Sequence, residues 1–145
     1  MRRKLLSIFF VLIAIFNLCN VALADDSEIV PYSSDYLNGA TVFLRAVGNG
    51  RMAVDITVDA VGVADTVGVR EIYIEHLVNG RWKYYDSMDS VDHPEFYDYN
   101  SRDYLATIYF DGISGDTYRV TLQVYAKKGS GSDTHDLTSR AVSCK

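Results

Sequence analysis

The chain has 145 residues, of which 48% are hydrophobic and 23% charged, and 14 basic against 19 acidic side chains give a formal net charge of -5. A chain of this size and apolar content can bury one core and is too hydrophobic to be mainly disordered. The acidic balance argues against binding to nucleic acid, because that interaction depends on clustered Lys and Arg.

The first 24 residues have the three-part layout of a secretory signal peptide. Basic residues 2–4 precede an apolar run from Leu5 to Phe16, and residues 22–24 (Ala-Leu-Ala) place small side chains where a signal peptidase cleaves. A permanent membrane anchor is the alternative, but the run is short for a bilayer span. A lipoprotein would need Cys19 as lipid acceptor, and the bulky Leu18 precedes it. We therefore predict cleavage after residue 24, secretion, and no stable membrane span afterwards.

Removal of this leader, which holds three basic residues and no acidic ones, leaves a net charge of -8 and a single cysteine, Cys144. One thiol cannot form an internal disulfide, so a buried core must supply the stability. Cys144 offers pairing between two molecules as an alternative, although a lone thiol in a frayed C-terminal tail is more often incidental. Residues 25–37 are acidic, contain Pro31 and show no period, which predicts a linker or a loosely attached first strand.

From residue 38 onward, apolar and polar residues alternate with period two between turn dipeptides, as in half-buried strands. The dipeptides are Asn38-Gly39, Asn49-Gly50, Asn79-Gly80 and Asp111-Gly112. The alternation predicts strands at 42–46, 52–60, around 72–74, and at 81–86, 104–110, 118–126 and about 133–142. No segment sustains a helical period over three turns. About seven short strands with glycine-rich turns predict an all-β fold for residues 38–145, a single antiparallel β-sandwich or a small barrel.

The start of the 118–126 strand favours the sandwich. Asp116 stands two residues before Tyr118, and the apolar Val120 stands two residues after it. This pattern resembles the tyrosine corner of immunoglobulin-like and fibronectin-III-like domains, in which the tyrosine hydroxyl bonds back to nearby backbone. Val120 occupies the position of the second cysteine of a true immunoglobulin domain, so the resemblance is to the disulfide-free branch of that architecture.

Three further stretches carry a resemblance over most of the mature chain. They are the strand 68–74, the hairpin Asn79-Gly80-Arg81-Trp82, and residues 118–132, which end in a Gly/Ser turn. The layout is similar to a family of small secreted bacterial proteins of unknown function. What the resemblance implies is one exported immunoglobulin-like sandwich with no assigned activity.

Metal sites have little support in the sequence. His76, His93 and His135 form no short-spaced pair with another ligand of the kind that zinc sites use, and a histidine closing an apolar strand face, as His76 does, is usually a packing residue. The irregular stretch 87–102 follows Asp86 with acids at every third residue, which suggests a weak calcium site or, as we prefer, a solvated acidic loop with room for one helical turn. We predict no metal and no cofactor.

The best candidates for ligand binding are three tyrosines predicted to point outward from neighbouring strands: Tyr73, Tyr85 and Tyr125. Exposed aromatic rings on one sheet face can bind sugars or peptides. The alternative is that cross-strand aromatic pairs stabilise the sheet without binding a ligand. Trp82 is either part of such a face or an inward core anchor. A carbohydrate or a protein on a cell surface is the expected partner.

Catalytic motifs are missing from the sequence: it holds no nucleophile elbow, phosphate-binding glycine loop, zinc motif or CxxC pair. We therefore expect a secreted, non-enzymatic binding or surface-interaction module. Two alternatives stay open. One is a small extracellular hydrolase, for example glycoside-directed, using two of the many acids. The other is a structural protein that associates with itself through an edge strand or Cys144.

Overall fold

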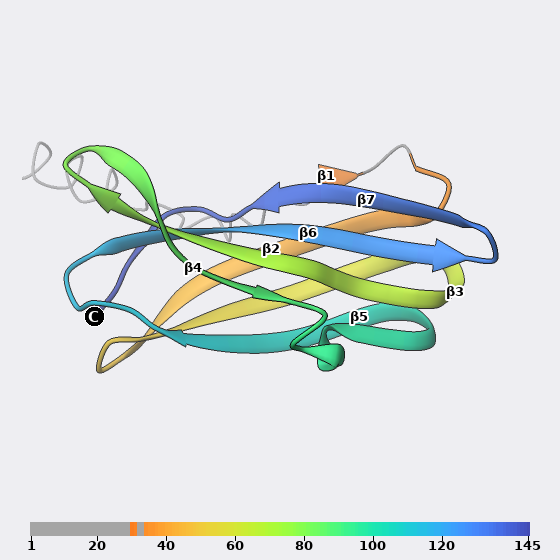
Figure 1. Ribbon diagram of the computed structural model, residues 1–145, viewed down its shortest axis with the longest axis horizontal. Helices are drawn as coiled ribbons and strands as arrows, with labels where there is room; N and C mark the ends of the chain where they lie inside the picture. The colour runs from red at the N-terminus through yellow and green to blue at the C-terminus, as the bar shows by residue number, and fades with distance from the viewer. Residues whose placement is uncertain (1–29, 32–33) are drawn as a thin grey trace, which may run out of the picture.

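The computed structural model describes residues 30–31 and 34–145 (Figure 1). The predicted signal peptide and most of the predicted linker lie outside this range. No helix in the described residues is long and apolar enough to cross a membrane.

The described residues form strands and one short 3-10 helix, η1, and every strand pairing is antiparallel. This confirms the predicted all-β antiparallel fold. In chain order the elements are β1 (Val30–Pro31), β2 (Leu37–Gly48), β3 (Arg51–Val78), β4 (Arg81–Asp89), η1 (Pro94–Phe96), β5 (Tyr97–Asp111), β6 (Thr117–Lys128), β7 (Gly131–Thr138) and β8 (Val142–Ser143).

The organising element is β3, a strand of 28 residues that runs to one end of the molecule, bends there and returns (Figure 1). Its first part pairs with β2 on one side and β5 on the other, and its last part pairs with β6 and β4. A register shift against β5 between Asp59 and Ala64 marks the bend between the two parts. One sheet therefore curls over itself, and the core lies between its two halves.

The continuity of β3 corrects the predicted strand boundaries. We expected one strand at 52–60 and a separate one around 72–74. Residues between them are paired instead: Thr66 lies opposite Tyr99 of β5 and Lys127 of β6. Pairing with strands distant in sequence keeps the backbone extended between the two predicted strands.

The core consists of the apolar side chains that alternate along these strands. Val120, Leu122 and Val124 of β6 are fully buried, and the row in the first part of β3 is buried nearly as completely: Met52, Val54, Ile56 and Val58. Burying a side chain of this size stabilises a fold by about 1.5–3 kcal/mol. The period-two faces predicted for β3 and β6 are thus confirmed.

Two of the predicted Asn-Gly turns adopt the backbone that tight hairpins require. Asn49 and Gly50 have φ of 54° and 78°, and Asn79 and Gly80 have φ of 51° and 74°, as in a type I′ turn. The turn predicted at Asn38-Gly39 is wrong. These residues lie inside β2, where Gly39 opposes Asp59 and a register shift absorbs the irregularity. Burial of Leu37 and Ala40 on either side holds the segment in the sheet.

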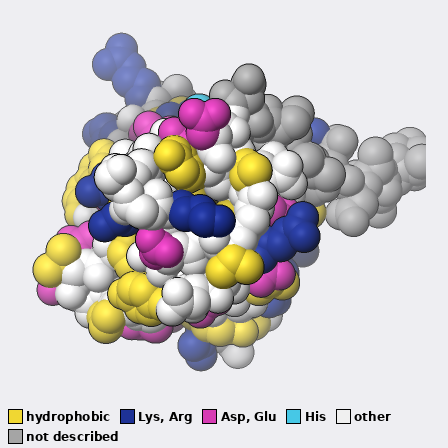
Figure 2. Space-filling view, turned by 90° about the vertical axis from the view of Figure 1, so that its right-hand side faces the viewer, with side chains coloured by type: hydrophobic (Ala, Val, Ile, Leu, Met, Phe, Trp, Pro, Cys, Tyr) yellow, Lys and Arg dark blue, Asp and Glu magenta, His cyan; other side chains and the backbone are white. Residues whose placement is uncertain are grey.

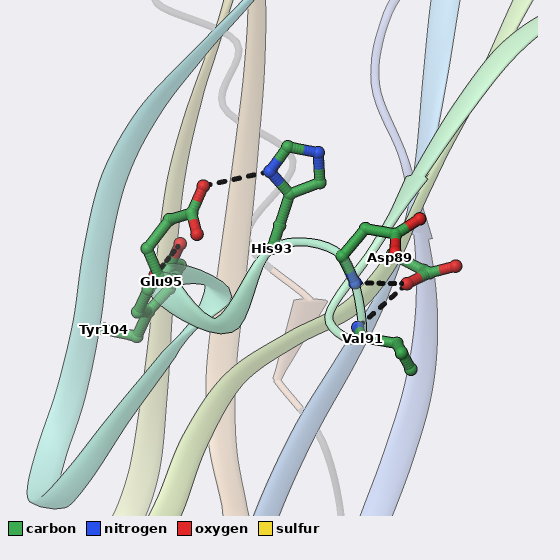
Figure 3. Close-up of polar contacts among 6 residues, drawn as sticks. Asp89, Val91, His93, Glu95 and Tyr104 are labelled. Atoms are coloured by element: carbon green, nitrogen blue, oxygen red, sulfur yellow. Dashed lines mark hydrogen bonds and ion pairs between the residues drawn. The ribbon is translucent and has the colours of Figure 1, made fainter.

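The acidic stretch is mostly strand, not the long loop that we predicted. β4 continues to Asp89 and β5 begins at Tyr97, so residues 90–96 alone lie between strands, and η1 supplies the helical turn that we considered there. Asp89 organises this connection, because its Oδ1 accepts the backbone N–H groups of Val91 at 2.8 Å and Asp92 at 3.0 Å (Figure 3). These amides, that of Asp92 foremost, hold the pKa of Asp89 below its ordinary value.

The C-terminus is bound to the fold, so the prediction of a frayed tail is wrong. β8 pairs with the start of β6, the Cys144 amide donates to the Asp116 carbonyl at 2.8 Å, and the Cys144 carbonyl accepts from Gly115 at 3.0 Å. The Cys144 side chain is 3% exposed. A disulfide between two molecules would require this end of the chain to detach.

Candidate ligand-binding face

The solvent-facing side of the β4–β3–β6–β7 part of the sheet carries most of the side chains suited to ligand binding. We call it the outer face. It is formed by residues that alternate with the core positions: Glu71, Tyr73 and Glu75 of β3, Trp82 and Tyr84 of β4, Arg119, Thr121, Gln123 and Tyr125 of β6, and Asp136 of β7.

One end of the outer face is a group of aromatic rings and a cation. The rings of Tyr73 and Tyr84 lie 5.4 Å apart on adjacent strands. Beside them the Arg119 guanidinium lies 4.5 Å from the centre of the Trp82 ring. The same guanidinium donates to Glu75 at 2.7 Å, which holds it over the ring. These contacts fix the orientation of the aromatic surfaces before any ligand arrives.

The other end holds a second aromatic pair. Tyr97 of β5 and Tyr125 of β6 oppose Gly68 of β3 from either side, and their rings lie 5.8 Å apart. The absence of a side chain at Gly68 lets the backbone of Phe96 and Tyr97 lie close against β3. The Arg70 guanidinium lies 5.1 Å from the centre of the Tyr125 ring.

A shallow trough crosses the outer face between the two aromatic groups. One hollow is lined by Glu71, Tyr73, Glu75, Thr121, Gln123 and Asp136. A second hollow shares Glu71 and Gln123 with it and continues to Arg70 and the Asp89–Val91 turn. Carboxylates, an amide, a hydroxyl and a guanidinium thus line a groove with flat rings at both ends. Such a surface can accept and donate hydrogen bonds to a hydroxyl-rich ligand while a ring packs against it.

The end of the molecule at which β3 bends is less suited to ligand binding than the outer face. Figure 2, which looks onto the right-hand end of Figure 1, shows apolar groups separated by positive and negative side chains. Val61 and Val63 are each 57% exposed here, and a small hollow beside them is lined by Asp35, Tyr36 and Lys128 among others. Scattered apolar side chains of this kind are ordinary on protein surfaces.

The three predicted tyrosines do not share one face. Tyr73, 37% exposed, and the half-buried Tyr125 lie on the outer face as predicted. Tyr85 points inward, which corrects its predicted outward position: its ring packs on Tyr118, and its hydroxyl donates to the Asp111 carbonyl at 2.8 Å. The cause is the Asn79-Gly80 hairpin, which pairs Val78 with Arg81 and so places Tyr84 opposite the outward Glu75; Tyr85, the next residue, takes the inward side.

Tyr84 is therefore the ligand-face residue that sequence reasoning missed. The Asn79-Gly80 turn could have identified it, because pairing outward from Val78 and Arg81 places Tyr84 opposite Glu75, on the same face as Tyr73. Trp82 lies on the outer face beneath Arg119 and is not a core anchor.

His76 has the packing role that we predicted. It is partly buried between Tyr85 and Tyr118, with ring-centre distances of 5.2 and 6.0 Å, and its Nδ1 lies 3.2 Å from Asp116 Oδ2.

His93 serves the β4–β5 connection. Its Nδ1 lies 2.9 Å from Glu95 Oε1, which lowers the pKa of Glu95 (Figure 3), and its ring stacks on Phe96. His135 lies on β7 opposite Val124. Within the described residues, no group of three His, Cys, Asp or Glu side chains could hold a metal ion.

The hydroxyl contact expected of a tyrosine corner is confirmed. Tyr118 is fully buried, and its Oη accepts the Ile113 backbone N–H at 2.8 Å. Burial raises the pKa of Tyr118 to about 12. The broader similarity to immunoglobulin-like domains stays a prediction. The chain matches no known family, no curated protein and no solved structure.

Proposed function

We propose that this protein is a secreted, non-enzymatic binding module with an immunoglobulin-like architecture, and that its outer face binds a carbohydrate at a cell surface. The observation that carries the proposal is the exposed Tyr73–Tyr84 ring pair beside the polar trough. The three-part leader supports export.

The chemistry of the trough favours a sugar. A pyranose ring has an apolar side that packs on a flat aromatic ring, and tyrosine supplies that area at low cost in conformational entropy. Its hydroxyl groups need both acceptors and donors, and Glu71, Gln123 and Thr121 provide them within one hollow. Because the trough is shallow and open, it suits a chain or a surface better than a small enclosed molecule.

The displaced carboxyl pKa values favour binding over hydrolysis. A glycosidase needs a general acid whose pKa is raised. The carboxyl groups with displaced pKa in the described residues are displaced downward, by hydrogen bonds or a neighbouring guanidinium: Asp55, Asp89, Glu95 and Asp133. A hydrolase is therefore the second candidate, and the experiment below includes it.

The test is a pull-down of the purified protein on insoluble glycans and cell-wall fractions, followed by titration with soluble oligosaccharides. We expect Tyr73→Ala and Tyr84→Ala each to weaken binding about tenfold, a loss of about 1.4 kcal/mol. Tyr109→Ala is the matched control, because Tyr109 is an exposed tyrosine on the other half of the sheet.

Unchanged retention of the Tyr73→Ala, Tyr84→Ala double variant would overturn the proposed face. Release of reducing sugar from a bound glycan, lost in Glu71→Gln or Glu75→Gln, would overturn the non-enzymatic role and favour the hydrolase.

A further inference from the structure

Another side of the molecule, where β4 and β5 lie near each other, combines a free strand edge with an apolar hollow. Both strands flank β3 on the same side, β4 along its last part and β5 along the rest. Within the described residues, each pairs with β3 alone, so the outer backbone edge of each strand has no strand partner (Figure 1). A free edge presents unpaired N–H and C=O groups to any chain that can lie beside it.

The space between β4 and β5 is closed at both ends. At one end the Tyr85 hydroxyl of β4 donates to the Asp111 carbonyl of β5 at 2.8 Å. At the other end the Tyr104 hydroxyl of β5 donates to the Glu95 carbonyl at 3.3 Å, beside the buried Phe96 of η1 (Figure 3). Tyr85 thus joins β4 to β5 at one end and Tyr104 joins β5 to η1 at the other, and neither of these two hydrogen bonds crosses the middle.

The middle of this space is an apolar hollow, which we call the β4–β5 slit, with Met88, Phe96, Tyr104, Ala106 and Ile108 on its walls. The inward row of β5 shows the opening directly. Tyr104 and Phe110 at the ends of the row are 2% and 7% exposed, whereas Ala106 and Ile108 between them are only partly buried. Two core positions in succession therefore lack a covering side chain.

The segments that form the slit are acidic, and Glu95 is the acidic side chain among the residues that line it. Residues 86–111 contain seven of the 19 acidic side chains of the protein and one of its 14 basic side chains, Arg102. An occupant that combines apolar and basic side chains matches both the lining and this charge.

We propose that the β4–β5 slit receives a short extended basic peptide, which adds as a strand to the free edge of β5 and places alternate apolar side chains over Ala106 and Ile108. Backbone hydrogen bonds to the β5 edge supply affinity, and the two uncovered core positions select apolar side chains at every second residue. The stretch from Leu105 to Tyr109 accommodates about five extended residues, roughly 17 Å at about 3.3 Å each.

Two other occupants fit less well. A small apolar molecule would use the lining but leave the strand edge unpaired and the charge unused. A second copy of this chain carries the same net charge of -5, so it would meet these acidic segments with like charge.

The test is a titration of the purified protein with a fluorescein-labelled nine-residue peptide of alternating lysine and valine. We expect saturable binding at least tenfold tighter than that of a lysine–serine peptide, which has the charge but no apolar side chains. It should also be tenfold tighter than that of the lysine–valine peptide methylated on alternate backbone nitrogens, which cannot pair with a strand edge.

Ala106→Trp fills the slit and should weaken binding of the lysine–valine peptide at least tenfold. Val61→Trp is the control, because Val61 is 57% exposed at the bend of β3 and lies outside the slit and the stretch that pairs with the peptide; it should change nothing. If Ala106→Trp disturbs folding, Asp111→Lys removes charge from the rim, at an exposed side chain, and should weaken binding severalfold.

Four outcomes would overturn the proposal. The first two are no binding up to about 1 mM peptide and equal binding of the lysine–serine peptide. The third is unchanged peptide binding by the folded Ala106→Trp or Asp111→Lys variant. The fourth is a dimer of the protein that Ala106→Trp dissociates. Binding of the dye 1-anilinonaphthalene-8-sulfonate that the peptide fails to displace would assign the slit to small apolar molecules instead.

Discussion

The two faces of the β4–β3–β6 sheet use tyrosine in opposite ways. On the inner face Tyr85 and Tyr118 pack edge to face at 5.0 Å, Phe110 lies 5.6 Å from Tyr118, and each tyrosine hydroxyl bonds to backbone. On the outer face Tyr73 and Tyr84 also meet, at 5.4 Å, but Tyr73 is more than one-third exposed and Tyr84 more than half.

The tyrosines of the inner face therefore serve stability, and those of the outer face serve the recognition that we propose. The inner rings join three segments: the turn at 112–116, the end of β5 and β4. Tyr118 bonds to the turn through its hydroxyl group, and Tyr85 of β4 bonds to the end of β5. The outer rings rest on a sheet that is already formed. Removal of an inner ring should therefore unfold the protein, and removal of an outer ring should leave the fold intact and alter only what it binds.

The largest effect that we expect is that of Tyr118→Ala. Loss of a fully buried aromatic side chain leaves a cavity, and we predict a fall in the free energy of unfolding of about 3–5 kcal/mol. Urea denaturation followed by circular dichroism measures it. Tyr73→Ala, the matched outer change, should cost less than about 0.5 kcal/mol. Equal losses for the two variants would contradict the division between the faces.

A smaller effect is expected at Gly68, where the start of β5 lies close against the backbone of β3. Gly68 has φ of +152°, and a Cβ there would lie 2.0 Å from the Phe96 carbonyl oxygen. Gly68→Ala should lower the free energy of unfolding by about 1–3 kcal/mol, because the backbone must move or be strained.

Gly62→Ala is the control for Gly68→Ala, since a Cβ at Gly62 has no atom within 4 Å, and it should be close to neutral. If both glycine variants were equally stable, close packing at Gly68 would not be the reason for glycine there.

Alkaline pH tests the inner tyrosines alone. Burial raises the pKa of Tyr118 and of Tyr104 from 10.0 to about 12 in the folded chain. Their contribution to stability is therefore complete below about pH 10 and is lost as the pH rises through about 12.

Ultraviolet absorbance at alkaline pH, recorded together with circular dichroism, should show these two groups ionising as the fold is lost. Tyr118→Phe should remove one of them. Ionisation of every tyrosine before any loss of structure would be inconsistent with this assignment.

The sequence pattern alone was sufficient to predict features that depend only on residues close together in the chain. The alternation in 52–60 and 118–126 predicted which side chains form the core, because a strand places successive side chains on opposite faces. Asn49-Gly50 and Asn79-Gly80 predicted two hairpins, because these residues tolerate positive φ. The spacing of Asp116, Tyr118 and Val120 predicted the hydroxyl contact to nearby backbone.

Tertiary structure decided the features that depend on partners distant in sequence. Pairing with β5 and β6 joined residues 61–70 into β3, and contacts with Gly115 and Asp116 bound Cys144 into the fold. A register shift at Ile74 and Glu75 placed Asp86 opposite the inward Ile74 and Ser87 opposite the outward Tyr73, since a shift of one residue in a strand exchanges its two faces. Alternation along a strand is a local property, but the register between strands is set only when the sheet assembles, and the composition of the outer face depends on that register.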